Sequence, residues 1–504
     1  MSHDLPRLGA TTPLPDGVTG PRVRPESVGI VHLGWGAFHR AHQAVYTEDA
    51  MALGGDRSWG ILGDVERTPV LVPALREQDG RYTVLTSGVD DDGTVVRTAR
   101  VIGSVVDVAY PGDETPRLLA AMAADSTRLI TLTVTEKGYT RTADGHLDLP
   151  QVAADVTAFT AALRGEADPV AAVSAIGLLV RGLLARFHAG GSPVTVLSCD
   201  NIPHNGRVLW SVVDEFIAAA DTDTDAFRSW LADSTTWPSS MVDRITPAAT
   251  DATRAEIAAV LGARDEAGIL AEPFSQWVIE DRFAAGRPAW ELAGAEFTTD
   301  VTAWENAKLF MLNGTHSLIA YAGRLLGHTT MADAVGDPRI AAAAREYMMR
   351  DALPTLTVPE GADLAEYGEG LLRRFANPAT GHTTTQVSTD GSQKLPIRWG
   401  RVVADSLAAG RVPRGVAFGL AAWSEFVRRA VRDGIDLGDP AGAETLTATV
   451  RAAVSSSTAA PEDLAATLIA LPGLLPDGAG TAPGLVAAVV AQVRALTAVG
   501  DDVI

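Results

Sequence analysis

The sequence predicts an α/β domain with a mostly parallel sheet, followed by a mainly α-helical domain. Short apolar segments alternate with helical segments up to about residue 245, which is typical of a parallel sheet with helical crossovers. Beyond that point alanine dominates and the apolar segments have helical length. We therefore expect domains over residues 1–245 and 246–504, and a loose arm over residues 1–24, which are rich in proline, glycine and threonine.

The order of elements follows from local patterning. In the first domain, strands are expected over 28–33, 59–63, 82–85, 95–106, 129–135 and 194–198. The segment 129–135 is the strongest candidate for a buried strand because it is rich in β-branched residues. Helices are expected between the strands, among them 116–124 and 152–164. In the second domain, helices are expected over 252–261, 306–326, 340–350, 401–408, 415–433 and 484–496.

Composition excludes several classes of protein. Of 504 residues, 46% are hydrophobic and 20% charged, as in folded globular proteins. The net charge of −21 disfavours nucleic acid and anionic membranes as partners. A single cysteine, Cys199, excludes an intrachain disulfide framework and a multi-cysteine metal site. No apolar stretch reaches the roughly 18 residues of a membrane span, and no signal peptide is evident, so a cytoplasmic location is expected.

The turn Gly34-Trp35-Gly36 follows a strand and precedes a helix. This is the context in which a dinucleotide fingerprint is meaningful, although His39 stands where the third glycine would be. The alternative is a tight turn that uses glycine for its geometry alone. Asp64, just past the second strand, is placed to hold the ribose hydroxyls of NAD and to repel the phosphate of NADP. The alternative for this residue is a solvated loop aspartate.

The helix over residues 303–324 carries four polar side chains on one arc. At about 100° per residue, Glu305, Lys308, Asn313 and His316 share one side of a largely apolar helix. One explanation is a structural network in which Lys308 pairs with Glu305. The other is an active-site wall, because a desolvated lysine has a lowered pKa and acts as a general base, and an asparagine amide stabilises an oxyanion.

Other polar clusters follow predicted strands. Ser198–Gly206 and Glu136 come directly after buried strands, at the sheet edge where ligands bind. The first of these is equally consistent with an ordinary turn. Asp243 and Arg244 lie between apolar residues, which also fits an internal salt bridge. Lys394 lies in a long polar segment, 374–396, where a turn with a solvated lysine is the simpler interpretation.

Together and in this order, these segments resemble the polyol-specific long-chain dehydrogenases, the mannitol dehydrogenase family. The resemblance spans about residues 28–400 and rests on segments 34–43, 135–139, 198–206, 241–247, 308–316 and 390–396. Its most specific part is Lys-x4-Asn-x2-His with Cys-Asp-Asn and Met-Val-Asp-Arg-Ile upstream. It implies a Rossmann-like dinucleotide-binding domain and a metal-independent dehydrogenase that transfers hydride between NAD(H) and a secondary alcohol, with NADP(H) as the alternative cofactor. His39 and His42 are accordingly interpreted as part of the helix start at the cofactor, not as metal ligands.

The resemblance also implies a role for each matched residue. By this resemblance, Lys308 is the general base, Asn201 and Asn313 form the oxyanion hole, and His316 orients the reacting hydroxyls. Asp243 and Lys394 contact the remaining hydroxyls, Glu305 is the proton relay, and Gly34, Gly36 and Phe38 belong to the cofactor turn. Asp64 and Glu136 are expected to contact the cofactor from their positions after strands, although the segment Ile61–Asp64 is unusual for the family. The partner is a sugar alcohol or sugar acid, and a monomer or small homo-oligomer is expected.

Two segments, 136–139 and 392–396, favour one substrate class, because they look more like the fructuronate reductase branch of the family than the mannitol dehydrogenase branch. The expected reaction is reduction of D-fructuronate to D-mannonate, with Lys137 or Arg244 pairing with the carboxylate. The alternatives are D-mannitol oxidised to D-fructose, another polyol such as arabinitol, and a non-catalytic NAD-binding sensor. The intact Lys308 argues against the sensor. One departure stands out: family members often have His-Arg-Thr-x-Gln where this chain has Thr383 in place of the arginine.

Overall fold

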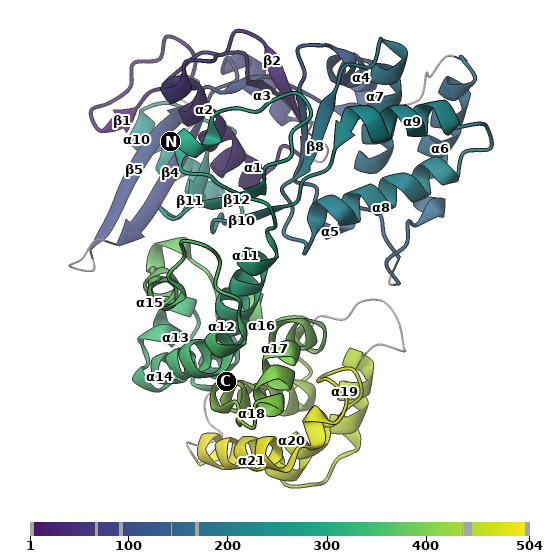
Figure 1. Ribbon diagram of the computed structural model, residues 1–504. Coiled ribbons are helices and arrows are strands. Elements are labelled where there is room, and N and C mark those ends of the chain that lie inside the picture. The colour runs from purple at the N-terminus through teal and green to yellow at the C-terminus, as the bar shows by residue number, and fades with distance from the viewer. Residues whose placement is uncertain are drawn as a thin grey trace. The chain divides into compact units, whose positions relative to one another are not determined.

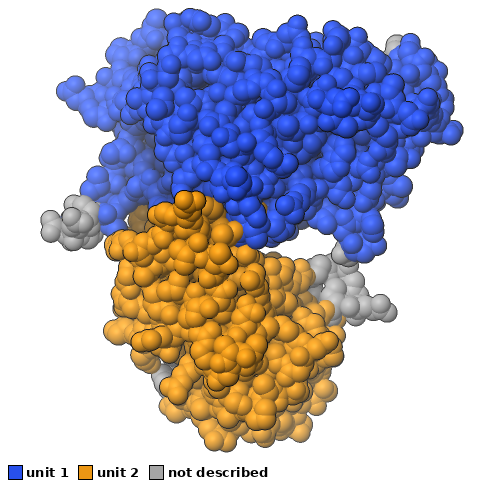
Figure 2. Space-filling view, viewed as in Figure 1, with its two compact units in different colours: residues 1–302 blue, residues 303–504 orange. Residues whose placement is uncertain are grey.

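The computed structural model describes residues 5–65, 69–89, 94–142, 144–166, 171–435, 437 and 446–498. The chain divides into two compact units, residues 1–302 and 303–504, which Figure 2 distinguishes by colour. The division therefore lies after residue 302, where the sequence had suggested 245. Residues 246–302 join the first unit because two of their strands complete its sheets: β11 (Ile269–Ala271) pairs with β4 (Tyr82–Val89), and β12 (Gln276–Glu280) pairs with β10 (Ser240–Asp243).

A six-stranded parallel sheet organises the first unit (Figure 1). Its order is β6 (Val105–Ala109), β3 (Gly60–Asp64), β2 (Val28–Leu33), β7 (Leu129–Leu132), β8 (Val194–Ser198) and β9 (Thr235–Thr236). The strand order is that of the Rossmann fold: successive strands are added outward on one side of β2 up to β6, and the order then switches to the other side of β2 at β7. The prediction of a mostly parallel Rossmann-like sheet is confirmed. The segment 129–135 is shorter as a strand than expected, because the chain turns after Leu132.

Helices and two smaller sheets cover both faces of this sheet. Ile30 and Val31, adjacent on β2, belong to different cores because successive side chains of a strand point to opposite faces. The helices of the unit are α1 (Ala37–Ala41), α2 (Gln43–Gly54), α3 (Leu71–Glu77), α4 (Pro111–Ala123), α5 (Thr135–Gly138), α6 (Leu149–Leu163), α7 (Ala175–His188), α8 (Asn205–Ala218), α9 (Asp225–Ser234), α10 (Asp251–Leu261) and the 3₁₀ turn η2 (Trp290–Ala293). Figure 1 shows α4, α6, α7, α8 and α9 gathered on the β8 side.

The N-terminal segment is packed, contrary to the loose arm expected over residues 1–24. Leu8 is 1% exposed, and its backbone N–H donates to Arg264 O at 2.8 Å. The strand β1 (Val18–Thr19) pairs in parallel with β5 (Val95–Ile102), in a sheet of order β1-β5-β4-β11. A third sheet has the order β10-β12-β13, with β13 at Glu296–Thr298. Burial of apolar side chains such as Leu8 outweighs the turn-rich composition of this segment.

The second unit is helical, as predicted. Its elements are α11 (Thr302–Ala307), η3 (Lys308–Asn313), α12 (Gly314–Leu325), α13 (Met331–Gly336), α14 (Pro338–Glu346), η4 (Tyr347–Ala352), η5 (Leu353–Thr355), α15 (Leu364–Phe375), η6 (Pro378–Thr380), α16 (Thr384–Ser388), α17 (Gly391–Ala408), α18 (Arg414–Arg432), α19 (Leu446–Ser456), α20 (Pro461–Ile469), η7 (Ala479–Thr481) and α21 (Pro483–Thr497). The segment 374–396, interpreted as loop and turn, mostly forms α16 and the start of α17. Among the described residues, no helix has the length and apolar character needed to cross a membrane.

Candidate active site

The turn after β2 meets two neighbouring turns at the carboxyl edge of the six-stranded sheet. Gly34 has φ +83°, and a Cβ there would lie 2.3 Å from Thr133 O, so glycine is required. The N–H of Trp35 donates to Asp64 O at 2.7 Å. The ends of β2, β3 and β7 are thereby joined at one place, where the topology of an open α/β sheet places its ligand.

Gly36 differs from Gly34 in that the protein itself does not require glycine there. Its φ is −93°, and the nearest atom to a Cβ at this position would be Gly34 O, at 3.7 Å. This open space is what the close approach of a pyrophosphate needs. Asp64, at the end of β3, is 1% exposed, which contradicts the alternative of a solvated loop aspartate. The edge therefore fits a dinucleotide cofactor.

Two buried histidines, His32 and His39, pack next to the turn Gly34–Gly36. The rings of His32 and His39 stack with centroids 3.4 Å apart. The two ring nitrogens of His32 are hydrogen-bonded to Thr131 Oγ1 and Thr133 Oγ1, each at 2.8 Å. Burial lowers the pKa of His32 to about 3 and holds the pKa of His39 well below its usual value. Both rings are therefore neutral near pH 7 and serve the packing of β2 against α1 and β7.

The third histidine of this region, His42, also has a structural partner. Its Nε2 is hydrogen-bonded to Gln276 O at 2.9 Å, and its ring stacks on the half-buried Phe38 with centroids 4.9 Å apart. In the part of the chain that the structure describes, no group of three histidine, cysteine or carboxylate side chains is arranged to hold a metal. The structure thus gives His39 and His42 packing roles at the start of α1 and α2.

Asp200 ties the loop after β8 to the loop after β7. Its carboxylate accepts hydrogen bonds from the N–H of Thr135 at 2.7 Å, the N–H of Val134 at 3.2 Å and the hydroxyl of Tyr139 at 3.1 Å. Burial is the largest influence on this group and raises its pKa to about 6. Thr135 has φ +65°, a conformation unusual for a β-branched residue. The hydrogen bond from its N–H to Asp200 helps to hold that conformation.

Asn205, which begins α8 a few residues after Asp200, connects this loop to β10. Its Nδ2 donates to Asp200 O at 2.9 Å and to Ser240 O at 2.8 Å, and its Oδ1 accepts from Ser240 N at 3.0 Å. Asn201, the predicted oxyanion residue, is exposed in the loop that Asn205 anchors. Asp243, the predicted hydroxyl contact, ends the strand β10 that begins at Ser240. One buried amide therefore fixes the segments that carry both predicted residues.

The two cations expected to meet a carboxylate are placed differently. The Nε of Arg244 donates to Glu272 O at 3.0 Å and another guanidinium nitrogen donates to Ala41 O. Burial lowers the pKa of Arg244, and the side chain works mainly as a brace between segments. Lys137 is exposed on the single-turn helix α5, beside Glu136, which is also exposed. Because both side chains are exposed, their predicted contacts, with a carboxylate for Lys137 and with the cofactor for Glu136, stay predictions.

In the second unit, four predicted residues lie on one helical segment, but it is not a uniform α-helix. Glu305 lies in α11, His316 lies in α12, and Lys308 and Asn313 are the first and last residues of the π-helical turn η3. A π-helical turn bonds residue i to i+5, so residues five apart lie closer in angle than they do in an α-helix. The arc predicted at a constant 100° per residue is therefore wrong in detail, because Lys308 and Asn313 are brought nearer to one face.

Side chains from other elements hold this turn by its backbone carbonyls. The hydroxyl of Tyr347 donates to Phe310 O at 2.6 Å, and Arg398 donates to Asn313 O at 3.2 Å. The indole N–H of Trp399 donates to Gly314 O at 3.2 Å. A Cβ at Gly314 would lie 2.0 Å from the Tyr347 hydroxyl oxygen, so glycine is needed for this approach. Lys308, which is 9% exposed, is thus carried by a turn that is fixed from outside.

His316 lies among aromatic and cationic side chains. Its ring stacks on Phe375 with centroids 5.1 Å apart and meets the edge of His382 at 4.8 Å. Its Nε2 is buried and has no hydrogen-bond partner among the described residues. Burial first, and then His382, Arg398, Arg374 and Lys394, hold the pKa of His316 well below its usual value. A neutral imidazole with an available ring nitrogen suits hydrogen bonding to a substrate oxygen.

Lys394 and Thr383 lie on neighbouring helix starts. The Nζ of Lys394 donates to Thr389 O at 2.8 Å and lies 3.7 Å from Asp390, so it is not the simple solvated lysine of the alternative interpretation. Thr383, where family members often have arginine according to the resemblance, is the N-cap of α16. Its Oγ1 accepts from Gln386 N at 3.2 Å, while its own N–H donates to Gln386 Oε1 at 3.0 Å. The substitution therefore supplies a capping box.

The structure thus groups the predicted residues in two sets. Gly34, Gly36, Asp64, Glu136, Lys137 and Asn201 lie at or just beyond the carboxyl edge of one sheet, and Glu305, Lys308, Asn313 and His316 lie on one helical segment. Sequence reasoning missed Asp200 and Asn205, although their polar segment directly follows a buried strand. It also missed Tyr347 and Arg398, for which the sequence offers no local signal because they act on a distant turn.

A Rossmann sheet with an open glycine turn, together with a buried lysine on a braced helix, defines a dinucleotide-dependent oxidoreductase. The family model of the mannitol dehydrogenase Rossmann domain matches residues 28–292, and that of the mannitol dehydrogenase C-terminal domain matches residues 300–496. The chain therefore belongs to the mannitol dehydrogenase family. This confirms the predicted class, an NAD-dependent oxidoreductase acting on CH–OH groups.

Individual relatives agree with this assignment. D-mannonate oxidoreductase of Escherichia coli (strain K12) is 42% identical over 425 residues, which cover 82% of this chain and 83% of the relative. Mannitol 2-dehydrogenase of Cereibacter sphaeroides is 36% identical over 406 residues, covering 79% and 80%. The solved structure of Pseudomonas fluorescens mannitol 2-dehydrogenase, a ternary complex with NAD and D-mannitol, aligns with a TM-score of 0.76 at 31% identity, covering 97% and 96%.

Proposed function

We propose that this oxidoreductase reduces the keturonate D-fructuronate to D-mannonate. The observation that carries the proposal is that, beyond burial, the positive charges of Arg398, Arg374 and Lys394 help to lower the pKa of His316, so three cationic groups act at this position. In a chain of net charge −21, such a gathering favours one anionic group of a substrate over a neutral sugar. The 42% identity to a protein named D-mannonate oxidoreductase supports the same substrate class.

The carboxylate partner we favour is Arg374, at the end of α15 next to the Phe375 ring on which His316 stacks. A guanidinium presents several N–H donors in the planar arrangement that a carboxylate accepts. Arg244 is a weaker candidate because its guanidinium braces two backbone carbonyls. Lys137 remains a candidate because it is exposed near the edge of the sheet.

The proton chemistry belongs to the chain's own residues. NADH, when bound, supplies the hydride that forms the new C–H bond at the carbonyl carbon and leaves as NAD⁺. Lys308 Nζ gives its proton to the carbonyl oxygen in reduction and takes the hydroxyl proton in oxidation. The amides of Asn201 and Asn313 donate hydrogen bonds to the same oxygen, which stabilises its developing negative charge. His316 and Asp243 orient neighbouring hydroxyls, and Lys394 contacts a further one. Glu305 relays a proton from solvent to Lys308 after reduction, and from Lys308 to solvent after oxidation.

A second candidate is the oxidation of D-mannitol to D-fructose. It is favoured by the alignment, over 97% of this chain, with a mannitol 2-dehydrogenase solved with NAD and D-mannitol. The two candidates differ in one carboxylate. We therefore compare rates of NADH oxidation with D-fructuronate and with D-fructose, and repeat both with NADPH. A higher kcat/KM for D-fructuronate supports our proposal, and a higher kcat/KM for D-fructose replaces it with the second candidate. Reduction of NAD⁺ by D-arabinitol, without NADH oxidation by D-fructuronate or D-fructose, would assign another polyol.

The role of Arg374 is tested with the variant Arg374→Gln. Loss of a charged hydrogen bond to a carboxylate costs about 1.5–3 kcal/mol, so KM for D-fructuronate is expected to rise by roughly 10- to 100-fold. KM for D-fructose is expected to stay within about twofold. The matched control is Arg373→Gln, because Arg373 is the exposed neighbour and pairs with Glu366. Equal changes in KM for both substrates would contradict carboxylate recognition by Arg374.

Lys308→Ala separates an enzyme from an NAD-binding sensor. We expect the variant to lose at least about 100-fold in kcat, as removal of a general base does, with the Kd for NADH nearly unchanged. An unchanged kcat would refute Lys308 as the base. Absence of turnover by the unmodified protein with every sugar and sugar acid tested, despite NADH binding, would favour the sensor.

A further inference from the structure

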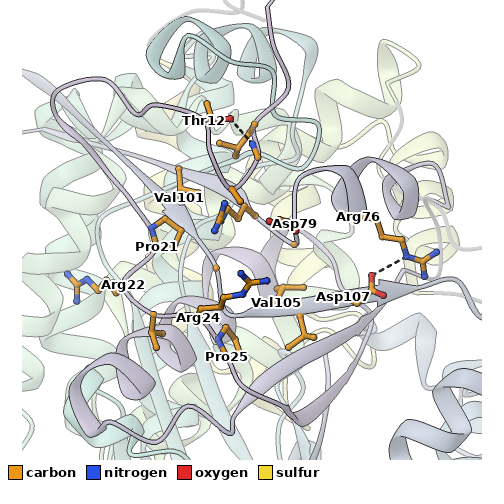
Figure 3. Close-up of a pocket in the computed structure, with 18 of the residues that line it drawn as sticks. Thr12, Pro21, Arg22, Arg24, Pro25, Arg76, Asp79, Val101, Val105 and Asp107 are labelled. Atoms are coloured by element: carbon orange, nitrogen blue, oxygen red, sulfur yellow. Dashed lines mark hydrogen bonds and ion pairs between the residues drawn. The ribbon is translucent and has the colours of Figure 1, made fainter.

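A pocket of about 640 Å³ lies in the first unit, at the edge of the sheet opposite the glycine turn (Figure 3). Its walls include Pro25, which precedes β2, and Val105, the first residue of β6. These are amino ends of parallel strands, whereas the turn that holds Gly34 is at the carboxyl end of β2. A strand of five or six residues separates the two edges by roughly 15–20 Å. The pocket is therefore distinct from the candidate active site.

The packed N-terminal segment forms one side of this pocket. Leu8 and Leu14 of this segment line the pocket, and both belong to the apolar cluster that contains Val101. Gly80 closes the floor, where a Cβ would lie 2.3 Å from Val105 O. A volume of this size is within the range of sites for small molecules. Polar groups, the arginines among them, make up more of the pocket surface than apolar groups do.

Two of the arginines that line the pocket lack a partner. In the described part of the chain, the guanidinium groups of Arg24 and Arg81 have no carboxylate or hydrogen-bond acceptor. Their backbone oxygens alone are used: Arg24 O accepts from Arg57 Nε, and Arg81 O accepts from Gln78 Nε2, each at 2.8 Å. Figure 3 shows Arg24 near the middle of the pocket, between Pro25 and Val105, with Arg22 and Arg76 at its two sides.

Neighbouring arginines show that this lack of partners is a local exception. The ion pairs around the pocket are Arg7 with Glu77, Arg22 with Asp49, Arg57 with Glu26, and Arg76 with Asp107 and Glu114. The sequence has 62 acidic residues against 41 lysines and arginines, so carboxylates are abundant. Asp79, which is exposed at the rim, is the one acidic lining residue outside these described pairs. Two guanidiniums against one rim carboxylate leave a net positive charge in the pocket.

We infer that this pocket binds a small organic anion, through phosphate or carboxylate groups held by Arg24 and Arg81. The two guanidiniums offer up to ten N–H donors, enough to hold a doubly charged group or two single ones. The volume of about 640 Å³ leaves room beside the anionic group for the organic body of a ligand. This second site is independent of the proposed reaction, because it shares no residue with the candidate active site.

The test measures anion binding by isothermal titration calorimetry, with NADH saturating and ionic strength constant. The probes are inorganic phosphate and citrate, with glycerol as a neutral comparison. We expect at least one anion to bind with a Kd below about 1 mM, and Arg24→Gln/Arg81→Gln to weaken it by at least about tenfold. The matched control is Arg97→Gln, because Arg97 is an exposed arginine paired with Glu256, and it should bind as the unmodified protein does.

The outcomes distinguish the chemistry of the ligand. Binding of phosphate alone assigns a phosphorylated ligand, and binding of citrate alone assigns a polycarboxylate. The double variant should keep the melting temperature and the kcat of the unmodified protein, because neither side chain has an internal partner to lose. Equal affinity of the unmodified protein and the double variant would overturn the inference, as would the failure of both anions to bind at 10 mM.

Discussion

At the scale of single residues, buried polar groups hold the segments that carry predicted site residues. Asp200 and Asn205 connect the ends of β7 and β8 to β10 through six hydrogen bonds. Such groups fix a loop only when all their donors and acceptors are satisfied, since each lost partner leaves a desolvated group. Their contribution is to hold the segments that carry Asn201 and Asp243, so in the proposed reaction they act as positioning residues.

The raised pKa of Asp200 predicts a specific pH dependence of stability. Its pKa is about 6 in the folded protein against 3.8 when unperturbed, so between about pH 4 and 6 the folded state holds a proton that the unfolded state has released. The free energy of unfolding therefore falls as the pH rises through this window, by about 3 kcal/mol from this group. Asp200→Asn replaces the titrating carboxyl with an amide, so it should remove this dependence of the free energy of unfolding on pH. Urea denaturation at pH 4.5, 5.5, 6.5 and 7.5 measures it.

A matched carboxylate separates this effect from a general change in charge. Asp233→Asn alters an exposed carboxyl on α9 and should keep the slope of the unmodified protein. Parallel profiles for the unmodified protein and Asp200→Asn would show that Asp200 titrates normally in the folded state.

The capping role of Thr383 predicts the effect of restoring the family's arginine. Thr383→Arg removes the side-chain oxygen that accepts from Gln386 N, so the free energy of unfolding should fall by about 1 kcal/mol. Thr383→Ser keeps a hydroxyl and should leave stability unchanged within a few tenths of a kcal/mol. Thermal and chemical denaturation of the three proteins measures the difference. An arginine variant as stable as the serine variant would show that the capping box contributes little.

At the scale of elements, the π-helical turn η3 determines how Lys308 and Asn313 are presented. Its widened backbone is maintained because Tyr347, Arg398 and Trp399 bond carbonyls at or just past the turn. Tyr347→Phe leaves Phe310 O buried without that hydrogen bond, which should cost about 1–3 kcal/mol of stability. Relaxation of the turn toward α-helical register should also lower kcat at least severalfold, with Kd for NADH unchanged.

The control for this prediction is another buried tyrosine of the same unit. The hydroxyl of Tyr321 donates to Ser388 O at 3.2 Å, away from the turn. Tyr321→Phe should lose comparable stability and keep its kcat, so the comparison separates loss of stability from loss of geometry. If Tyr347→Phe keeps full kcat, the carbonyl contact does not hold the register of Lys308.

The elements also show what the sequence could and could not predict. The β2–glycine turn–α1 unit was predicted correctly because it depends on local chemistry, namely an apolar strand followed by Gly34 and Gly36. The arc of Lys308 and Asn313 was wrong in detail because a π-helical turn depends on Tyr347, a residue far away in sequence. Likewise, the apolar residues that pack the N-terminal segment meet their partners only in the folded chain, so composition alone suggested a loose arm.

At the scale of the whole molecule, the division between units has a testable consequence. The sequence suggested a domain boundary at residue 245 because helices become frequent there. Local sequence patterns, however, do not show which later strands complete a sheet of the first unit. Trp277 and Trp290, both in segment 246–302, are fully buried in a core of the first unit. A chain cut after residue 245 loses β11, β12 and β13 and with them these two aromatic side chains.

We therefore predict that a fragment of residues 1–302 folds and binds NADH, whereas a fragment of residues 1–245 does not. Burying one tryptophan or phenylalanine side chain is worth several kcal/mol, and typical domains are stable by only about 5–15 kcal/mol, so losing both tryptophans and three strands exceeds that margin. Circular dichroism, gel filtration and quenching of NADH fluorescence compare the two fragments. The longer fragment should bind NADH and lack dehydrogenase activity, since Lys308 is absent from it. Cooperative unfolding and NADH binding by the shorter fragment would instead place the boundary at residue 245, with segment 246–302 as an addition that the Rossmann sheet does not require.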